Sequence, residues 1–211
     1  MPKTEAPLEY LRQFIPEGSA QLVLNYLHQY KVHLTVTRER KTVLGDYRNA
    51  VDGKNHRISV NGNLNEFAFL ITLIHELAHL VTFIQFGSKV KSHGKEWKQI
   101  YARMLVDFLK LDIFPADIKA AFKKTMHNLP ASSCADEVLT RVLKNYDKKA
   151  NGLLLVEQIM EGDLFQTSDK RIFRKGRKLR KRFECIEVGT KRVYLFSPIH
   201  EVHAALGGVH G

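Results

Sequence analysis

The sequence predicts an α+β fold: a helical body that contains a small antiparallel sheet, followed by a small β-rich unit at the C-terminal end. Up to about residue 146, apolar residues recur mostly at helical spacing, except between residues 33 and 60, where they alternate as in strands. After Gly152 the pattern changes to short alternating segments separated by turn residues. We therefore expect a body over residues 1–150, a β-rich unit over 151–203 and a tail over 204–211.

The first part of the body is expected to hold two amphipathic helices and three strands. One helix is predicted over residues 4–14, and a second follows Pro16 with an apolar face of leucine and tyrosine residues. Alternation then predicts strands over residues 33–37, 44–51 and 56–60, which glycine-containing turns separate. Three short strands joined in this way predict a small antiparallel sheet.

A long apolar helix is predicted next, over residues 64–86. Asn63 or Asn65 can cap its first turn, and Gly87 suits its end. A further helix begins near Ser92, and Pro115 at a first helical position starts another that reaches about residue 127. A last helix is expected over residues 135–146, with Ser132 or Ser133 as its cap.

The C-terminal unit is predicted to consist of short strands only. They are expected over residues 153–156, 163–166, 171–174, 178–188 and 192–196, and a hairpin turn is expected at Gly176. His200, His203 and His210 are assigned to the tail.

Composition excludes several classes of protein. With 44% apolar and 26% charged residues among 211, the chain is of the globular type, and its beginning does not resemble a secretory signal. No uninterrupted apolar run approaches the roughly 20 residues of a membrane span, so we expect no membrane partner and a cytoplasmic location. Two cysteines, Cys134 and Cys185, are too few for a cysteine-rich zinc finger.

The formal charge of +11 is concentrated in one segment, residues 170–182, where nine of thirteen residues are basic and none is acidic. Neutralising phosphates releases counterions, so such a segment favours DNA or RNA binding without sequence specificity. The alternative is a solvated charged hairpin that has no partner. The nine residues, called the basic strip below, are Lys170, Arg171, Arg174, Lys175, Arg177, Lys178, Arg180, Lys181 and Arg182.

The most specific motif is His75-Glu76-x-x-His79, within the long predicted helix. Two histidines four residues apart project from one helix face, so both imidazoles can reach a single Zn²⁺. Glu76 lies beside that metal without ligating it, and we expect it to act as the general base toward a zinc-activated water. The motif therefore predicts hydrolytic zinc chemistry.

A catalytic zinc site needs a third protein ligand. His93 is the favoured candidate, because the chain turns at Gly87 and an antiparallel return brings residue 93 back toward the metal. Glu96 is the alternative ligand, at a longer spacing. Four lysines surround this segment and are expected to add positive potential at the cleft: Lys89, Lys91, Lys95 and Lys98.

These residues together resemble the SprT-like family of zinc metallopeptidases. The resemblance covers residues 30–109 and includes the segments 44–47, 58–61, 73–79 and 92–97. It implies a zincin-like body, one Zn²⁺ held by His75, His79 and His93, and Glu76 as the general base. Bacterial members often end in a four-cysteine zinc ribbon, but only Cys185 is present in this C-terminal part, so we expect no second zinc.

Two functions follow as hypotheses. The first is a zinc metalloendopeptidase that acts on a protein or peptide substrate, including proteins associated with DNA. The second is a nucleic-acid-binding or transcription-associated protein whose zinc is structural or whose peptidase site is vestigial. The intact Glu76 favours the first, because a purely structural zinc has no use for a carboxylate at an open position.

Overall fold

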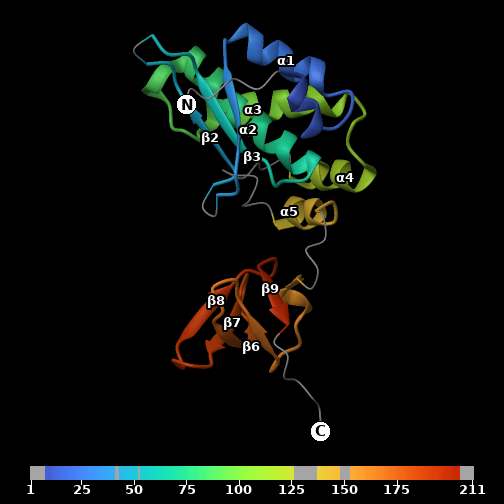
Figure 1. Cartoon of the computed structure of the whole chain (residues 1–211), viewed down its shortest axis with the longest axis vertical. Helices are drawn as coiled ribbons and strands as arrows, with labels where there is room; N and C mark the ends of the chain where they lie inside the picture. The colour runs from blue at the N-terminus through green and yellow to red at the C-terminus, as the bar shows by residue number, and fades with distance from the viewer. Residues whose placement is uncertain (1–7, 41–42, 52, 126–136, 148–152, 205–211) are drawn as a thin grey trace. The chain divides into compact units, whose positions relative to one another are not determined.

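The computed structural model describes residues 8–40, 43–51, 53–125, 137–147 and 153–204. The chain divides into two compact units, Met1–Asp147 and Lys148–Gly211, and each is described by itself (Figure 1). The helices of the first unit are η1 (Leu8–Gln13), α1 (Ala20–Gln29), α2 (Glu66–Phe86), η2 (Gly87–Lys89), α3 (Lys95–Leu109), α4 (Ala116–Thr125) and α5 (Glu137–Lys144).

Two predicted helix starts differ from those observed or lie outside the described residues. In the described part of residues 4–14, the chain forms the 3₁₀ helix η1 instead of an α-helix. The expected caps Ser132 and Ser133 belong to the undescribed residues 126–136, as does Cys134.

The sheet of the first unit is mixed, which corrects the antiparallel arrangement predicted from the sequence. Its strands β1 (His33–Thr37), β2 (Gly45–Arg48) and β3 (Arg57–Asn61) have the spatial order β1-β3-β2. β3 is parallel to β1 and antiparallel to β2. Ile58 and Val60 are 1% and 0% exposed, so the most buried of the three strands takes the central position and leaves β2 at an edge.

Helix α2 forms the centre of the first unit. Its apolar residues are buried on nearly all sides, because α3 packs against it and the strands β2 and β3 lie beside it (Figure 1). Among the described residues, it is also the one helix long and apolar enough to cross a membrane, over Glu66–Lys89, although 78% of its apolar window is buried inside the structure. A search for uninterrupted apolar runs misses this stretch, because His75, Glu76 and His79 interrupt it.

Asn65, and not Asn63, caps α2. Its side-chain oxygen accepts a hydrogen bond from the backbone nitrogen of Ala68 at 2.9 Å. Its amide donates to the carbonyl of Leu143 at 2.9 Å and to the carboxylate of Asp147 at 2.6 Å. This one side chain therefore joins the start of α2 to the end of α5.

We expect Asn65→Ala to lower the free energy of unfolding of the first unit by about 1–3 kcal/mol, because it removes a helix cap and leaves polar partners of α5 unpaired. The measurement is urea unfolding followed by the fluorescence of the chain's single tryptophan, Trp97, which lies in this unit. Asn63→Ala is the matched control, since Asn63 is exposed, and it should change stability by less than about 0.5 kcal/mol. Equal losses in the two variants would contradict the assignment of the cap.

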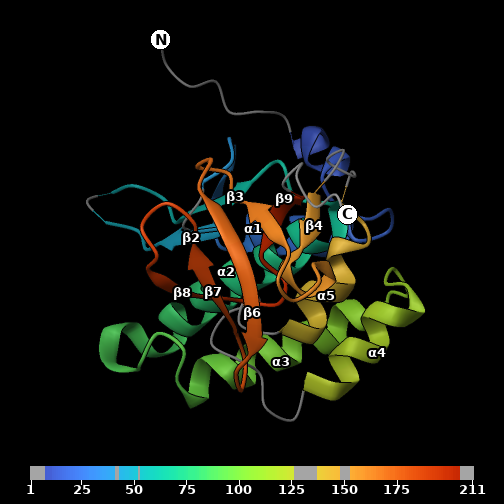
Figure 2. The ribbon, with the colours of Figure 1, turned by 90° about the horizontal axis from the view of Figure 1, so that it is seen from below.

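The second unit is a six-stranded antiparallel sheet with the order β4-β9-β5-β6-β7-β8 (Figure 2). Its small core contains Phe165, Phe173 and Cys185, each 0% exposed. The short 3₁₀ turn η5 (Val156–Gln158) follows the first strand. The strands are β4 (Leu153–Leu155), β5 (Leu164–Gln166), β6 (Ile172–Lys178), β7 (Phe183–Glu187), β8 (Val193–Phe196) and β9 (Glu201–Ala204).

Two predictions for this unit were wrong. The hairpin turn is not at Gly176: β6 continues through this residue, and the chain turns at residues 179–182, where the Leu179 nitrogen donates to the Arg182 carbonyl at 2.7 Å. His200 and His203 are not in a tail: the His200 carbonyl accepts a hydrogen bond from the Val156 nitrogen at 3.0 Å, and His203 pairs with Leu153 in the strand β9. His210, assigned to the same tail, lies outside the described residues. β9 was not recognised in the sequence because it is only four residues long and buries one side chain, Val202. It therefore shows no clear alternation of apolar and polar residues.

Gly176 is needed for a close approach of strands, not for a turn. The register of β6 against β7 shifts between Lys175 and Lys178, and a Cβ at Gly176 would lie 2.6 Å from the backbone oxygen of Glu184. Glycine in a strand often marks such an irregularity.

We expect Gly176→Ala to destabilise the second unit by about 1–3 kcal/mol, because the backbone oxygen facing the new methyl group cannot swing away as a side chain would. The measurement is amide hydrogen exchange in β6 and β7, which should become faster. Gly189→Ala is the control, since nothing lies within 4 Å of a Cβ there. Unchanged exchange in the Gly176 variant would contradict the close approach.

Candidate metal centre

Helix α2 supplies two of the three histidines of the site. His75 and His79 are four positions apart in the chain, so they lie one turn apart on the same helix face. His75 is 7% exposed, and His79 is half-buried. Because the rest of α2 is fixed in the core, the helix backbone holds these two side chains at a constant spacing.

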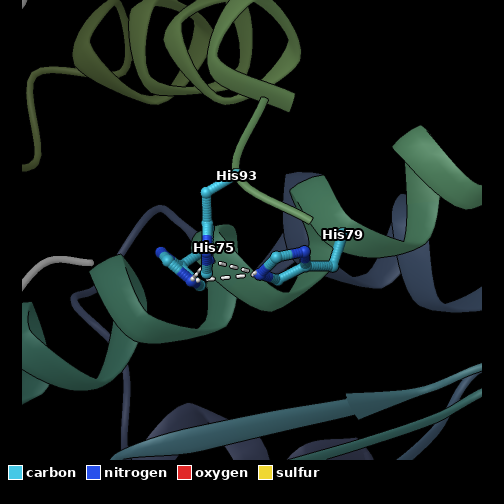
Figure 3. Close-up of side chains that lie close together, drawn as sticks. All are labelled: His75, His79 and His93. Atoms are coloured by element: carbon cyan, nitrogen blue, oxygen red, sulfur yellow. Dashed lines mark hydrogen bonds between the residues drawn. The ribbon is translucent and has the colours of Figure 1, made fainter. Parts of the chain in front are cut away.

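The third histidine comes from the loop before α3. Gly87 ends α2 with φ 62°, and the loop reaches His93 one residue before Gly94, which is the N-cap position of α3. The Gly94 nitrogen donates to the carbonyl of Lys91 at 2.9 Å, and a Cβ at Gly94 would lie 3.1 Å from that carbonyl oxygen. This tight turn directs His93 toward His75 and His79 (Figure 3).

The three Nε2 atoms converge on one point. The distances are 3.2 Å between His75 and His79, 3.0 Å between His79 and His93, and 3.2 Å between His75 and His93. A tetrahedral zinc with nitrogen ligands at about 2.0–2.1 Å requires ligand separations of about 3.3–3.4 Å. The donor set and its spacing therefore fit Zn²⁺, and Glu96 is not part of the cluster.

The site favours neutral imidazoles, the form that binds a metal. Burial, and then the charges of His79 and His93, lower the pKa of His75 to about 3. Burial and the charge of His93 lower the pKa of His79 to about 4. The pKa of His93 is also lowered, by burial and by Lys98. In the metal-free protein all three rings are therefore ready to ligate near neutral pH.

Glu76 is held in a buried position next to the edge strand β2. Its side chain is close enough to Gly45 that a Cβ there would lie 2.7 Å from the Oε1 atom. Burial and the charge of Asp46 raise the pKa of Glu76 to about 8 in the metal-free protein, against the opposing effects of Arg40 and a hydrogen bond from the Tyr47 backbone. A dication nearby would lower this pKa, because it favours the carboxylate.

No role at the site was assigned from the sequence to the residues that surround Glu76 and the histidines, although Gly45 and Trp97 lie in segments that carry the family resemblance. Gly45 allows β2 to approach α2, and Arg40 lies near Glu76 although it is 36 positions away in the chain. Trp97 packs against all three histidines. No spacing rule connects these positions, because the contacts depend on how the sheet and α3 pack against α2.

The basic strip lies in the second unit, and eight of its nine residues are exposed. Lys175 is the exception: it is 5% exposed, and its ammonium donates to the carbonyls of Glu157 and Ile159, so it is not on the surface. Arg171 pairs with Asp169 at 2.7 Å, and Arg177 lies 3.9 Å from Glu184. The surface charge is therefore smaller than the sequence count suggests.

A helix that carries His-Glu-x-x-His, completed by a histidine from the next loop, is the arrangement of a metallopeptidase-type domain. The comparison with protein families agrees with this class. The chain belongs to the SprT-like family, whose model matches residues 11–119, the part that contains the sheet, α2 and α3. No curated protein and no solved structure matches the chain.

Proposed function

We propose that this chain is a zinc-dependent endopeptidase. The observation that carries the proposal is the convergence of three Nε2 atoms at 3.0–3.2 Å from one another on the helix that also holds Glu76. A structural zinc site has four protein ligands, whereas the cluster found among the described residues offers three, which would leave one position for water. Membership of the SprT-like family supports the same reaction class.

Bound zinc polarises a peptide carbonyl and brings the pKa of water toward neutrality. The chain supplies the proton transfers. Glu76 accepts the proton of the attacking water and returns it to the leaving amine. The backbone nitrogen of Tyr47 donates to the Glu76 carboxylate and orients it for this exchange.

The edge strand β2 is suited to hold the substrate. Among the described residues β2 pairs with β3 on one side only, so its other edge can add an extended peptide as a further strand. Gly45 in this strand lies against Glu76, so a peptide bound along β2 passes close to the general base. Recognition through backbone hydrogen bonds selects an unfolded segment more than a particular side chain.

The test is hydrolysis of an unfolded protein such as casein by the zinc-loaded chain. We expect new N-termini in the products, detected by mass spectrometry, complete loss of cleavage with a chelator, and recovery when zinc is added back. Cleavage that persists in the metal-stripped protein would contradict the proposal. Zinc binding at one equivalent without any cleavage would favour the second hypothesis, a nucleic-acid-binding protein with a vestigial site.

A second function, nucleic-acid binding, is supported by the turn between β6 and β7. Lys178, Arg180, Lys181 and Arg182 are all exposed within five residues there, and Lys170 is exposed two residues before β6 begins. Such a cluster attracts phosphate without reading bases. We propose that it brings the peptidase to proteins that are bound to DNA or RNA.

We expect Arg180→Ala/Lys181→Ala to weaken binding of a random-sequence DNA duplex and to reduce the slope of log affinity against log salt by about 1–2. The measurement is fluorescence anisotropy between about 50 and 200 mM salt, because affinity that depends on phosphate contacts falls steeply over this range. Lys123→Ala/Lys124→Ala removes two exposed charges of the first unit and is the matched control. Equal slopes for wild type and the Arg180/Lys181 variant would remove the strip as the binding site.

A further inference from the structure

Trp97 on α3 contacts every histidine of the metal centre. The ring centroids lie 4.7 Å from His75, 5.2 Å from His79 and 4.7 Å from His93. The indole is 0% exposed. One side chain therefore packs against all three candidate ligands, which come from two separate parts of the chain.

Among the described residues, Nδ1 of His75 lacks the hydrogen-bond partner that fixes the ring orientation of most metal-ligating histidines. A ligating histidine usually donates its second ring N–H to a carboxylate or a carbonyl, which sets the rotation of the ring. Nδ1 of His75 is buried and finds no hydrogen-bond partner among the residues that the structure describes, and the same is true of the buried indole nitrogen of Trp97. A hydrogen bond at Nδ1 therefore does not set the rotation of the His75 ring among these residues.

Packing against aromatic rings can set that orientation instead. The His75 ring meets Trp97 at 60° and Tyr101 at 71°, so both contacts are edge-to-face, which is a preferred geometry for rings. Tyr101 in turn stacks on Trp97, with centroids 4.9 Å apart and an interplanar angle of 22°. Because residues 97 and 101 are one turn apart on α3, this helix holds the two rings as a unit.

We propose that Trp97 is a positioning residue of the metal centre, which orients the three imidazoles by ring contact in place of the hydrogen bond that His75 lacks. The inference rests on the proposed zinc site and assigns the residue that pre-forms it. Trp97 touches neither the substrate nor the reacting atoms in this role. Its contribution is to keep the Nε2 atoms convergent before the metal arrives, which reduces the reorganisation that metal binding needs.

The first test compares zinc affinities by competition with a chromophoric chelator. We expect Trp97→Leu to weaken zinc binding by about 10–100-fold, as loss of an outer partner of a metal ligand typically does. Trp97→Phe keeps a ring against the histidines but has no N–H, so it should restore affinity to within about fivefold of wild type. The visible spectrum of bound Co²⁺ should change in Trp97→Leu, because the ligand geometry relaxes.

Phe108→Leu is the matched control for general core damage. Phe108 is on the same helix, is also 0% exposed and has no ring contact with the three histidines among the described residues. We expect it to lower the unfolding midpoint while leaving zinc affinity unchanged. Equal losses of affinity in Trp97→Leu and Phe108→Leu would overturn the positioning role.

A measurement on the unmodified chain does not depend on any variant folding. Trp97 is the single tryptophan, so its fluorescence reports on this site alone. We expect Co²⁺ to quench it progressively up to one equivalent and then to have no further effect. Binding of one Co²⁺ without quenching would overturn the contact between Trp97 and the metal centre, whereas failure of wild type to bind any metal would overturn the proposed function itself.

Discussion

Glu76→Gln should reduce peptide hydrolysis by about 10²–10⁴-fold and leave zinc binding at one equivalent, because an amide fills the same space but cannot accept the proton of the attacking water. The measurement pairs casein cleavage with the zinc content of the purified protein. Loss of activity together with loss of zinc would mean that Glu76 is a ligand and not a base.

Asp46→Asn is the control for this variant, because Asp46 is the carboxylate whose charge raises the pKa of Glu76. It should change the rate by no more than about tenfold, since it takes no part in proton transfer. Cleavage that is unchanged in Glu76→Gln would remove the general-base role entirely.

The metal-free protein offers a second signature of Glu76→Gln. The pKa of Glu76 is raised to about 8 from an ordinary value of 4.5, so the folded chain holds a proton that the unfolded chain releases between these pH values. The stabilising contribution of the protonated carboxyl is therefore complete below about pH 4.5 and lost as the pH rises through 8. Glutamine does not titrate, so this loss of stability with rising pH is absent from Glu76→Gln. The difference between the unfolding midpoint of the variant and that of wild type should therefore increase from pH 5 to pH 8.

His93→Ala should lower zinc affinity by at least about a hundredfold. Structural zinc sites have binding free energies of about 10–16 kcal/mol, so one ligand in four corresponds to about 3 kcal/mol. The measurement is chelator competition, with the zinc content after dialysis as a second readout.

Glu96→Ala tests the alternative third ligand in the same experiment and should keep wild-type affinity, because Glu96 is outside the cluster of ligand nitrogens. His56→Ala controls for the loss of a histidine elsewhere in the first unit. His56 accepts hydrogen bonds in the β2–β3 connection, from the Ala50 nitrogen at 3.1 Å for example, and is also outside the cluster. Zinc lost from Glu96→Ala and retained by His93→Ala would reverse the ligand assignment.

Much of the fold was predictable, because helical periodicity is strong where one element is buried. The long helix was expected over residues 64–86 and runs over Glu66–Phe86. Pairing was harder to predict: the three strands look alike in the sequence, and nothing local shows that β3 takes the centre and lies parallel to β1. Gly176 was misread because glycine serves both turns and close strand contacts, and only the partner strand distinguishes the two.

The candidate metal centre was predictable to the extent that helix geometry fixes it. The spacing of His75 and His79 follows from the turn of a helix, and the structure brings His93 to them as expected. Arg40, Gly45 and Trp97 could not be found in this way, because they reach the site through tertiary packing. The basic strip illustrates the opposite error: counting charges includes Lys175, which the structure places inside the small core.

The burial of α2 also has a consequence for the protein during its synthesis. During synthesis, residues Glu66–Lys89 leave the ribosome before residues 95–109, which form the helix that later packs against them. A stretch apolar enough to cross a membrane is therefore exposed for a time in the nascent chain. The two histidines and the glutamate that interrupt the stretch make insertion into lipid costly, so the residues proposed for catalysis also favour folding in water.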